Sequence, residues 1–107
     1  MRALRLGLAQ INTTVGDLEG NAAKVLEYVE RARTQGVDLI SFPELTITGY
    51  PPEDLLLRPQ FIQDNVAALK QVAEGCRGIT AVVGFVDSNE DIYNAAAIIH
   101  DGRLVDV

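Results

Sequence analysis

The order of two repeating patterns constrains the fold of this chain most strongly. Short apolar segments with strand character alternate with two longer segments in which apolar residues recur every three or four positions. This alternation is typical of an α/β domain, in which helices connect neighbouring strands. A chain of 107 residues is long enough for one hydrophobic core of this kind. We therefore expect one α/β domain without internal repeats.

The individual elements follow from periodicity and from turn-forming residues. Strands are predicted over residues 3–11, 37–42, 79–86, 92–100 and 103–107, helices over residues 21–35 and 60–75, and a short helical turn over 53–58. Asn21 is the predicted cap of the first helix, and residues 87–89 are the predicted turn after the third strand. Asp101-Gly102 predicts a two-residue hairpin, because both central positions of that turn need a positive φ. The sheet is therefore expected to be mixed, with its fifth strand cut at residue 107.

Charge and cysteine content narrow the partners and the location. Nine basic and fifteen acidic residues give a net charge of -6, which repels a phosphate backbone, so nucleic acid is not an expected partner. No apolar run approaches the roughly 20 residues that cross a bilayer, and no signal-peptide segment opens the chain. The single cysteine, Cys76, cannot form an internal disulfide, as is typical of a reducing compartment. We expect a cytoplasmic protein that does not bind membranes.

One carboxylate is well placed for chemistry. In open α/β sheets, ligands bind outside the carboxyl ends of the strands, and the second predicted strand leads directly into Phe42-Pro43-Glu44-Leu45. Pro43 stiffens the backbone on both sides, so Glu44 is aimed rather than loosely tethered, as a general base must be. Phe42, Leu45 and Ile47 are its expected apolar neighbours. Position alone favours a plainer role, in which Glu44 is a solvated loop residue or a helix-cap acceptor.

The remaining reactive side chains are expected to be structural. Lys24, Lys70 and Cys76 lie on or beside the predicted helices, which pack against the sheet away from its carboxyl end. His100 abuts the hairpin and is expected to be a surface strand residue. Neither the spacing of metal-ligating residues nor that of the glycines indicates a site, so no metal-binding or cofactor-binding residue is predicted.

Several motifs resemble those of one enzyme superfamily. Phe42-Pro43-Glu44 followed by Gly49-Tyr50 resembles the first catalytic motif of the nitrilase, or carbon-nitrogen hydrolase, superfamily. Further similarities follow in the same order along the chain, at Gln10-Ile11-Asn12, Val15-Gly16-Asp17, Asn21, Tyr93-Asn94 and Asp101-Gly102. Within the superfamily, the octapeptide at residues 49–56 is most similar to the glutamine-dependent NAD synthetases.

This resemblance implies a fold and a set of catalytic residues. The fold would be an α-β-β-α sandwich, of which this chain is a part truncated within the fifth strand. The superfamily uses a glutamate, a lysine and a cysteine, and only the glutamate maps onto this sequence, at Glu44 as general base. The lysine and the cysteine would lie beyond Val107. Residues 1–107 would therefore be the amino-terminal part of one glutaminase domain, inactive alone.

The resemblance also implies a substrate and partners. Glutamine would be hydrolysed, and its ammonia would pass to a synthetase domain of the same protein, which uses ATP and magnesium to amidate deamido-NAD to NAD. A homo-oligomer is also expected. Two alternatives stay open: a stand-alone amidohydrolase of the same superfamily, and a non-catalytic α/β binding module.

Overall fold

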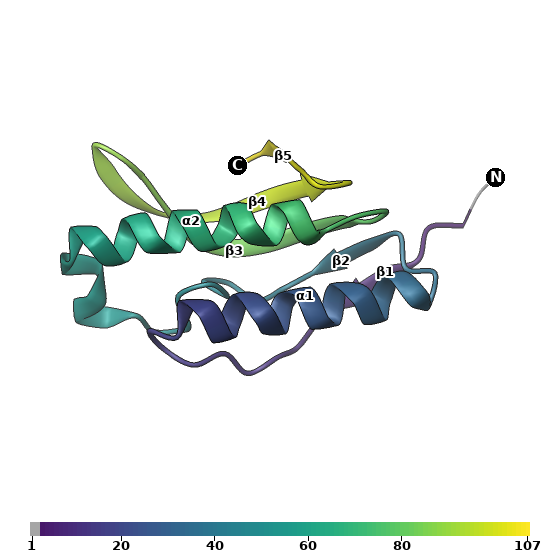
Figure 1. Cartoon of the computed structure of the whole chain (residues 1–107), viewed down its shortest axis with the longest axis horizontal. Helices are drawn as coiled ribbons and strands as arrows, with labels where there is room; N and C mark the ends of the chain where they lie inside the picture. The colour runs from purple at the N-terminus through teal and green to yellow at the C-terminus, as the bar shows by residue number, and fades with distance from the viewer. Residues whose placement is uncertain (1–2) are drawn as a thin grey trace.

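A mixed five-stranded sheet forms the centre of the structure, a computed structural model that describes residues 3–107. The elements are β1 (Leu6–Leu8), α1 (Leu18–Thr34), β2 (Leu39–Ser41), the 3-10 helix η1 (Glu53–Leu57), α2 (Pro59–Gly75), β3 (Thr80–Asn89), β4 (Asp91–His100) and β5 (Arg103–Asp106). The strands lie side by side in chain order. The first three are parallel, and β4 and β5 are antiparallel to their neighbours. Both long helices lie on one face of this sheet (Figure 1).

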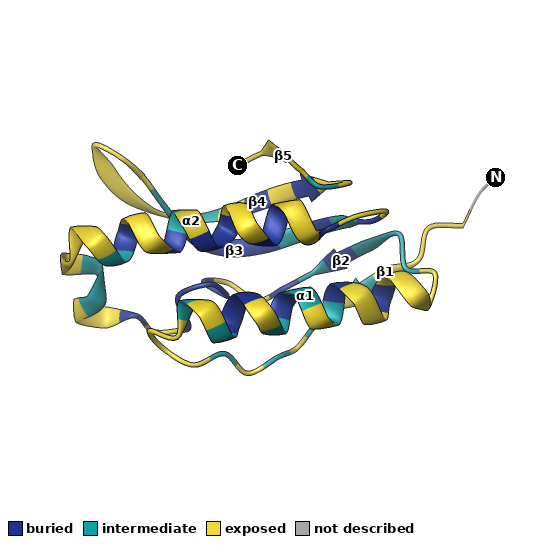
Figure 2. Cartoon of the chain, in the orientation of Figure 1, coloured by how far each residue is buried: buried dark blue, intermediate teal, exposed yellow. Residues whose placement is uncertain are grey.

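The hydrophobic core fills the space between the helices and the sheet. Each helix buries one apolar stripe, which includes Val25 and Val29 on α1 and Leu69 and Val72 on α2. Alternate residues of β3 pack against these stripes: Ala81, Val83 and Phe85. Burying a side chain of the size of Val or Phe stabilises the fold by about 1.5–3 kcal/mol. Figure 2 shows the buried stripe of each helix turned toward the sheet and the exposed stripe turned away.

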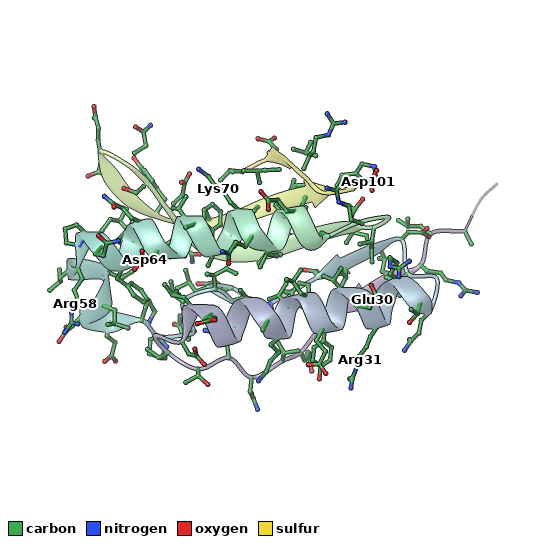
Figure 3. All side chains as sticks on the ribbon, viewed as in Figure 1. Glu30, Arg31, Arg58, Asp64, Lys70 and Asp101 are labelled. Carbon is green, nitrogen blue, oxygen red and sulfur yellow. The ribbon has the colours of Figure 1, made fainter. Side chains whose placement is uncertain are left out.

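The outer faces of the two helices carry charge. Glu30 and Arg31 on α1 and Asp64 and Lys70 on α2 are exposed and project outward (Figure 3). This polar surface explains the helical amphipathicity on which the sequence prediction rests. Within residues 3–107, neither helix is long and apolar enough to span a bilayer.

The opposite face of the sheet is open within the described residues. Side chains alternate between the two faces of a strand, so the neighbours of the core residues point away from the helices. Leu6, Leu8 and Ile98 lie on this helix-free face, and all three are exposed. Gly7, between the two leucines, faces the core instead, because a Cβ at this position would lie 3.2 Å from the side chain of Val37, which packs against the core. The sheet therefore has one packed face and one apolar open face.

The predicted order of elements is confirmed, and their boundaries shift. The first two strands are shorter than the ranges 3–11 and 37–42. The prediction that Asn21 caps the first helix is wrong, because the helix begins earlier and the Asp17 side chain accepts a hydrogen bond from the Gly20 N–H at 3.0 Å. Asn21 lies in the first turns of α1 and is buried.

The two hairpins give opposite outcomes. Residues 87–89 do not form the predicted turn but continue β3, which pairs with β4 as far as Asn89 opposite Asp91. The chain reverses at Glu90, whose φ is 67°. A ten-residue partner strand supplies ladder hydrogen bonds that outweigh the local turn preference of Asp, Ser and Asn. The Asp101-Gly102 hairpin is confirmed, with φ values of 47° and 85°.

Candidate active site

Glu44 lies just beyond the carboxyl end of β2, on the helix-free face of the sheet. The chain is still attached to β3 at Phe42, whose N–H donates to the Val82 carbonyl at 2.9 Å. The Glu44 side chain is exposed and lines a shallow pocket of about 260 Å³ together with side chains of β3 and β4, among them Val82, Asn94 and Ala96. The sequence prediction that Glu44 follows a strand end is confirmed.

The backbone that carries Glu44 is fixed by close contacts. Leu45 is buried although its φ is 51°, in the left-handed region that a leucine rarely adopts. The Thr46 hydroxyl donates to the Pro43 carbonyl, and the Ile47 N–H donates to the Gly84 carbonyl at 3.1 Å. Tertiary contacts hold this conformation in place, as is typical of backbone that aims a functional side chain.

Asn21 provides a second layer of support. Its side chain donates to the carbonyls of Thr14 at 2.8 Å and Ile47 at 3.0 Å, and its Oδ1 accepts from the Thr14 N–H at 2.8 Å. Helix α1, the loop after β1 and the segment after Glu44 are thus joined by one buried amide. Sequence reasoning treated Asn21 as a cap, and its place within an otherwise apolar helical stripe is the signal that points to this inner role.

Gly49 lets the two loops approach each other. Its φ is 80°, and a Cβ at this position would lie 2.6 Å from the Cα of Val15. The Gly16 N–H donates to the Thr48 carbonyl at 2.9 Å beside this contact. Only glycine combines this φ with this spacing. Several residues of the motifs found in the sequence therefore hold the segment that presents Glu44.

The apolar neighbours expected around Glu44 are only partly correct. Phe42 lines the pocket, whereas Leu45 and Ile47 are buried in the core and do not. The side-chain direction reverses between Glu44 and Leu45, because the positive φ turns the Leu45 side chain into the protein. The carboxylate therefore faces the helix-free side of the sheet.

Asn94 on β4 meets Glu44 across 50 positions of sequence. Its Nδ2 donates to Glu44 Oε1 at 2.6 Å. A carboxylate accepts and cannot donate, so the amide nitrogen is the atom that faces it. In the sequence, Asn94 stands out only as part of the Tyr93-Asn94 motif. No local pattern indicates this pairing, since it depends on how β3 and β4 align.

The other reactive side chains lie on or beside the two long helices and on β4. Lys24 donates from α1 to the Asn12 carbonyl at 2.6 Å, and Lys70 projects outward from α2 (Figure 3). Cys76 is fully buried in the core, and this burial raises the pKa of its thiol to about 11. His100 is exposed and its Nδ1 lies 2.8 Å from the Thr80 hydroxyl. None of the four lines the Glu44 pocket.

Two further features carry no candidate chemistry. A larger hollow of about 650 Å³ lies between η1, α2 and the β3–β4 hairpin, and no ionisable side chain lines it. Among residues 3–107, His, Cys, Asp and Glu side chains nowhere gather in a group of three that could hold a metal ion.

Comparisons with known proteins match the chain to one family and to several relatives. Residues 5–107 match the carbon-nitrogen hydrolase family. A glutamine-dependent NAD(+) synthetase of Thermotoga maritima is 49% identical over 109 aligned positions, which cover 100% of this chain and 19% of that protein. A protein of the same name from Xanthomonas campestris is 45% identical over 94% of this chain and 19% of its own length.

Solved structures have the same fold. A glutamine-dependent NAD(+) synthetase from Cytophaga hutchinsonii superposes with a TM-score of 0.90 at 30% identity, over 94% of this chain and 18% of that one. An amidase from Nesterenkonia sp. superposes with a TM-score of 0.79 at 23% identity, over 96% of this chain and 41% of that one, which is a likeness of fold alone. The chain spans about a fifth of the length of the synthetases it resembles and, by its match over residues 5–107, belongs to the carbon-nitrogen hydrolase family.

Proposed function

We propose that this chain is the amino-terminal part of the glutaminase domain of a glutamine-dependent NAD synthetase, with Glu44 as its general base. The supporting observation is the way Glu44 is held: it lies at a strand end on stiff backbone, and its carboxylate faces the open side of the sheet. Relatives that bear this name align over nearly all of the chain. In this proposal, the complete glutaminase domain includes residues 1–107 and further residues beyond Val107.

The reaction uses the carboxylate twice. In the first half, a cysteine thiol gives its proton to Glu44 while its sulfur bonds to the amide carbon of glutamine. The proton passes to the amide nitrogen and the C–N bond breaks. Ammonia is released, and the glutamyl group remains bound to the cysteine as a thioester. In the second half, Glu44 takes a proton from water as the water oxygen attacks the thioester, and returns it to sulfur as glutamate leaves. The cysteine and a lysine belong to the part of the domain beyond Val107.

The use of ammonia is assigned to a different part of the protein. A synthetase domain would amidate deamido-NAD with ATP and magnesium. Among residues 3–107, His, Cys, Asp and Glu side chains form no group of three that could hold a metal ion, so this part of the chain does not fit magnesium. Cytoplasmic location and homo-oligomeric assembly remain predictions of the same proposal.

The test is the variant Glu44→Gln in the full-length protein. This change keeps the size of the side chain and removes its basicity, so glutamine-dependent NAD synthesis is expected to fall by at least about 100-fold. Synthesis from free ammonia is expected to stay within about twofold of the unmodified protein, because the synthetase chemistry does not use Glu44. Both rates are measured with the same NAD assay.

The matched control is Glu74→Gln. Glu74 is an exposed carboxylate on α2, in the layer on the other side of the sheet. Both rates of this variant are expected to match those of the unmodified protein. Glutamine hydrolysis by Glu44→Gln at a near-normal rate would remove the assignment of Glu44 and with it the proposed mechanism.

A further inference from the structure

The hydrogen bond between Asn94 and Glu44 has a defined place in the sheet. Asn94 lies opposite Val86 in the antiparallel β3–β4 ladder. Val86 is two residues after Gly84, which contacts the backbone of the Glu44 segment. Its neighbour Ala95 packs against the core, so alternation turns the Asn94 side chain to the helix-free face, where the carboxylate lies. The pair is therefore set by the sheet and not by a flexible loop.

The bond leaves half of the carboxylate available. Asn94 Nδ2 contacts Oε1, while within residues 3–107 the second oxygen, Oε2, has no hydrogen-bond partner. The donor is a neutral amide, and no arginine or lysine of the described residues forms an ion pair with Glu44. An amide restricts the orientation of a carboxylate without placing a positive charge beside it. This combination suits a group that must accept a proton on one oxygen.

We propose that Asn94 is a positioning residue for Glu44, which fixes one carboxylate oxygen so that the other is presented to the reacting proton. This inference rests on the proposed function and adds a second residue to it. Asn94 itself takes no proton and forms no bond to substrate. Asn94 contributes by orienting the carboxylate. Orientation matters because displacing a catalytic group by about 1 Å lowers the reaction rate by up to about 100-fold.

The first test is Asn94→Ala in the full-length protein. The kcat for glutamine hydrolysis is expected to fall about 10- to 100-fold while KM stays within about twofold, because the interaction acts on the base and not on substrate binding. Ammonia-dependent synthesis is expected to stay unchanged. Asn89→Ala is the matched control, because Asn89 is an exposed asparagine of the same hairpin whose side chain makes no hydrogen bond in the described structure.

The second variant, Asn94→Asp, keeps the shape of the side chain and separates positioning from a merely structural role. It places a second carboxylate within hydrogen-bond distance of the first, and two like charges at this distance disfavour joint ionisation. The two carboxyl groups then release their protons in coupled steps, so the acid limb of the pH profile for glutamine hydrolysis is expected to move by about one unit or more. A change that acted only through the fold would lower the rate without moving this limb.

The outcomes distinguish this inference from the proposed function. If Glu44→Gln abolishes glutamine hydrolysis while both Asn94 variants keep kcat within about twofold and an unmoved pH profile, the positioning role is refuted and the general base stands. If Glu44→Gln keeps its activity, the proposed function itself fails. If Asn94→Ala does not fold, as judged by the loss of a cooperative thermal transition that the unmodified protein shows, the pH profile of Asn94→Asp decides the matter.

Discussion

The backbone of Glu44 lies directly against Gly84 of β3. A Cβ at position 84 would lie 3.0 Å from the carbonyl carbon of Glu44 and 2.6 Å from the carbonyl oxygen of Pro43. These atoms are backbone and cannot rotate away, as a flexible side chain would. The absence of one methyl group on β3 therefore sets how closely the Glu44 segment approaches the sheet.

Gly84→Ala is expected to displace Glu44. The added methyl group forces the segment away from β3, at a cost of about 1–3 kcal/mol, and moves the carboxylate relative to Asn94. In the full-length protein, glutamine-dependent synthesis should fall at least about 10-fold while ammonia-dependent synthesis persists. Gly75→Ala is the control, because its Cβ would meet the end of the Leu26 side chain, which can move. Equal effects of the two variants would show that the contact with Gly84 does not position Glu44.

Asn21→Ala is expected to loosen the two loops that Asn21 joins. The change leaves the Thr14 N–H and the carbonyls of Thr14 and Ile47 without their partner, and each buried group left unpaired costs about 1–3 kcal/mol. Hydrogen exchange followed by mass spectrometry on the full-length protein should show faster exchange in residues 13–16 and 43–49. The middle of α2 serves as the internal reference, and its exchange should not change. Unchanged protection of both loops would contradict this role of Asn21.

The Cys76 thiol is expected to be unreactive in the folded protein. Burial raises its pKa to about 11 from an ordinary value of 9.0, so at pH 8 it is almost entirely in the neutral form, which is a poor nucleophile. Iodoacetamide at pH 8 should label the peptide containing Cys76 only after denaturation, as read by mass spectrometry. Rapid labelling of the native protein would contradict the burial.

The raised pKa of Cys76 makes the folded state less stable at high pH. The folded state holds the neutral thiol, so its contribution is fully present below the ordinary pKa of about 9 and is lost as the pH rises from 9 toward 11, where the unfolded chain ionises first. Over that range, Cys76→Ala should lose less stability than the unmodified protein. Thermal melting of both proteins between pH 8 and pH 11 measures the difference.

Periodicity in the sequence was sufficient to predict the layers of the fold. The apolar stripes of α1 and α2 and the β-branched run of β3 predict elements that all appear in the structure in the expected order. The errors lie where tertiary contacts outweigh local preference. Asp17 and Asn21 are both good caps, and only the buried position of Asn21 shows that its amide serves the loops instead.

The sequence predicts one residue of the candidate site, Glu44, but not the residues that contact it. The strand end and the proline beside Glu44 are local features of sequence and predict its place at the sheet edge, whereas its catalytic role is an expectation from the motif resemblance. The partner Asn94 follows from the alignment of β3 with β4, and the contact with Gly84 follows from the pairing of β2 with β3, neither of which a short segment encodes. Leu45 has a positive φ, and contacts with residues distant in sequence, such as Gly84, help to hold the segment around it. Long-range register is thus the physical quantity that sequence reasoning lacked.

The β3–β4 ladder makes some changes of length harmless and others damaging. Residues added at the tip, around Glu90, lengthen the loop and leave Val86 opposite Asn94. One residue lost between Asp91 and Tyr93 shifts β4 by a single step, which turns Asn94 toward the helices and brings Ala95 beside the carboxylate. The tip of this hairpin is therefore expected to accept changes of length, whereas the stretch between the tip and Asn94 is expected to tolerate substitutions far better than insertions or deletions.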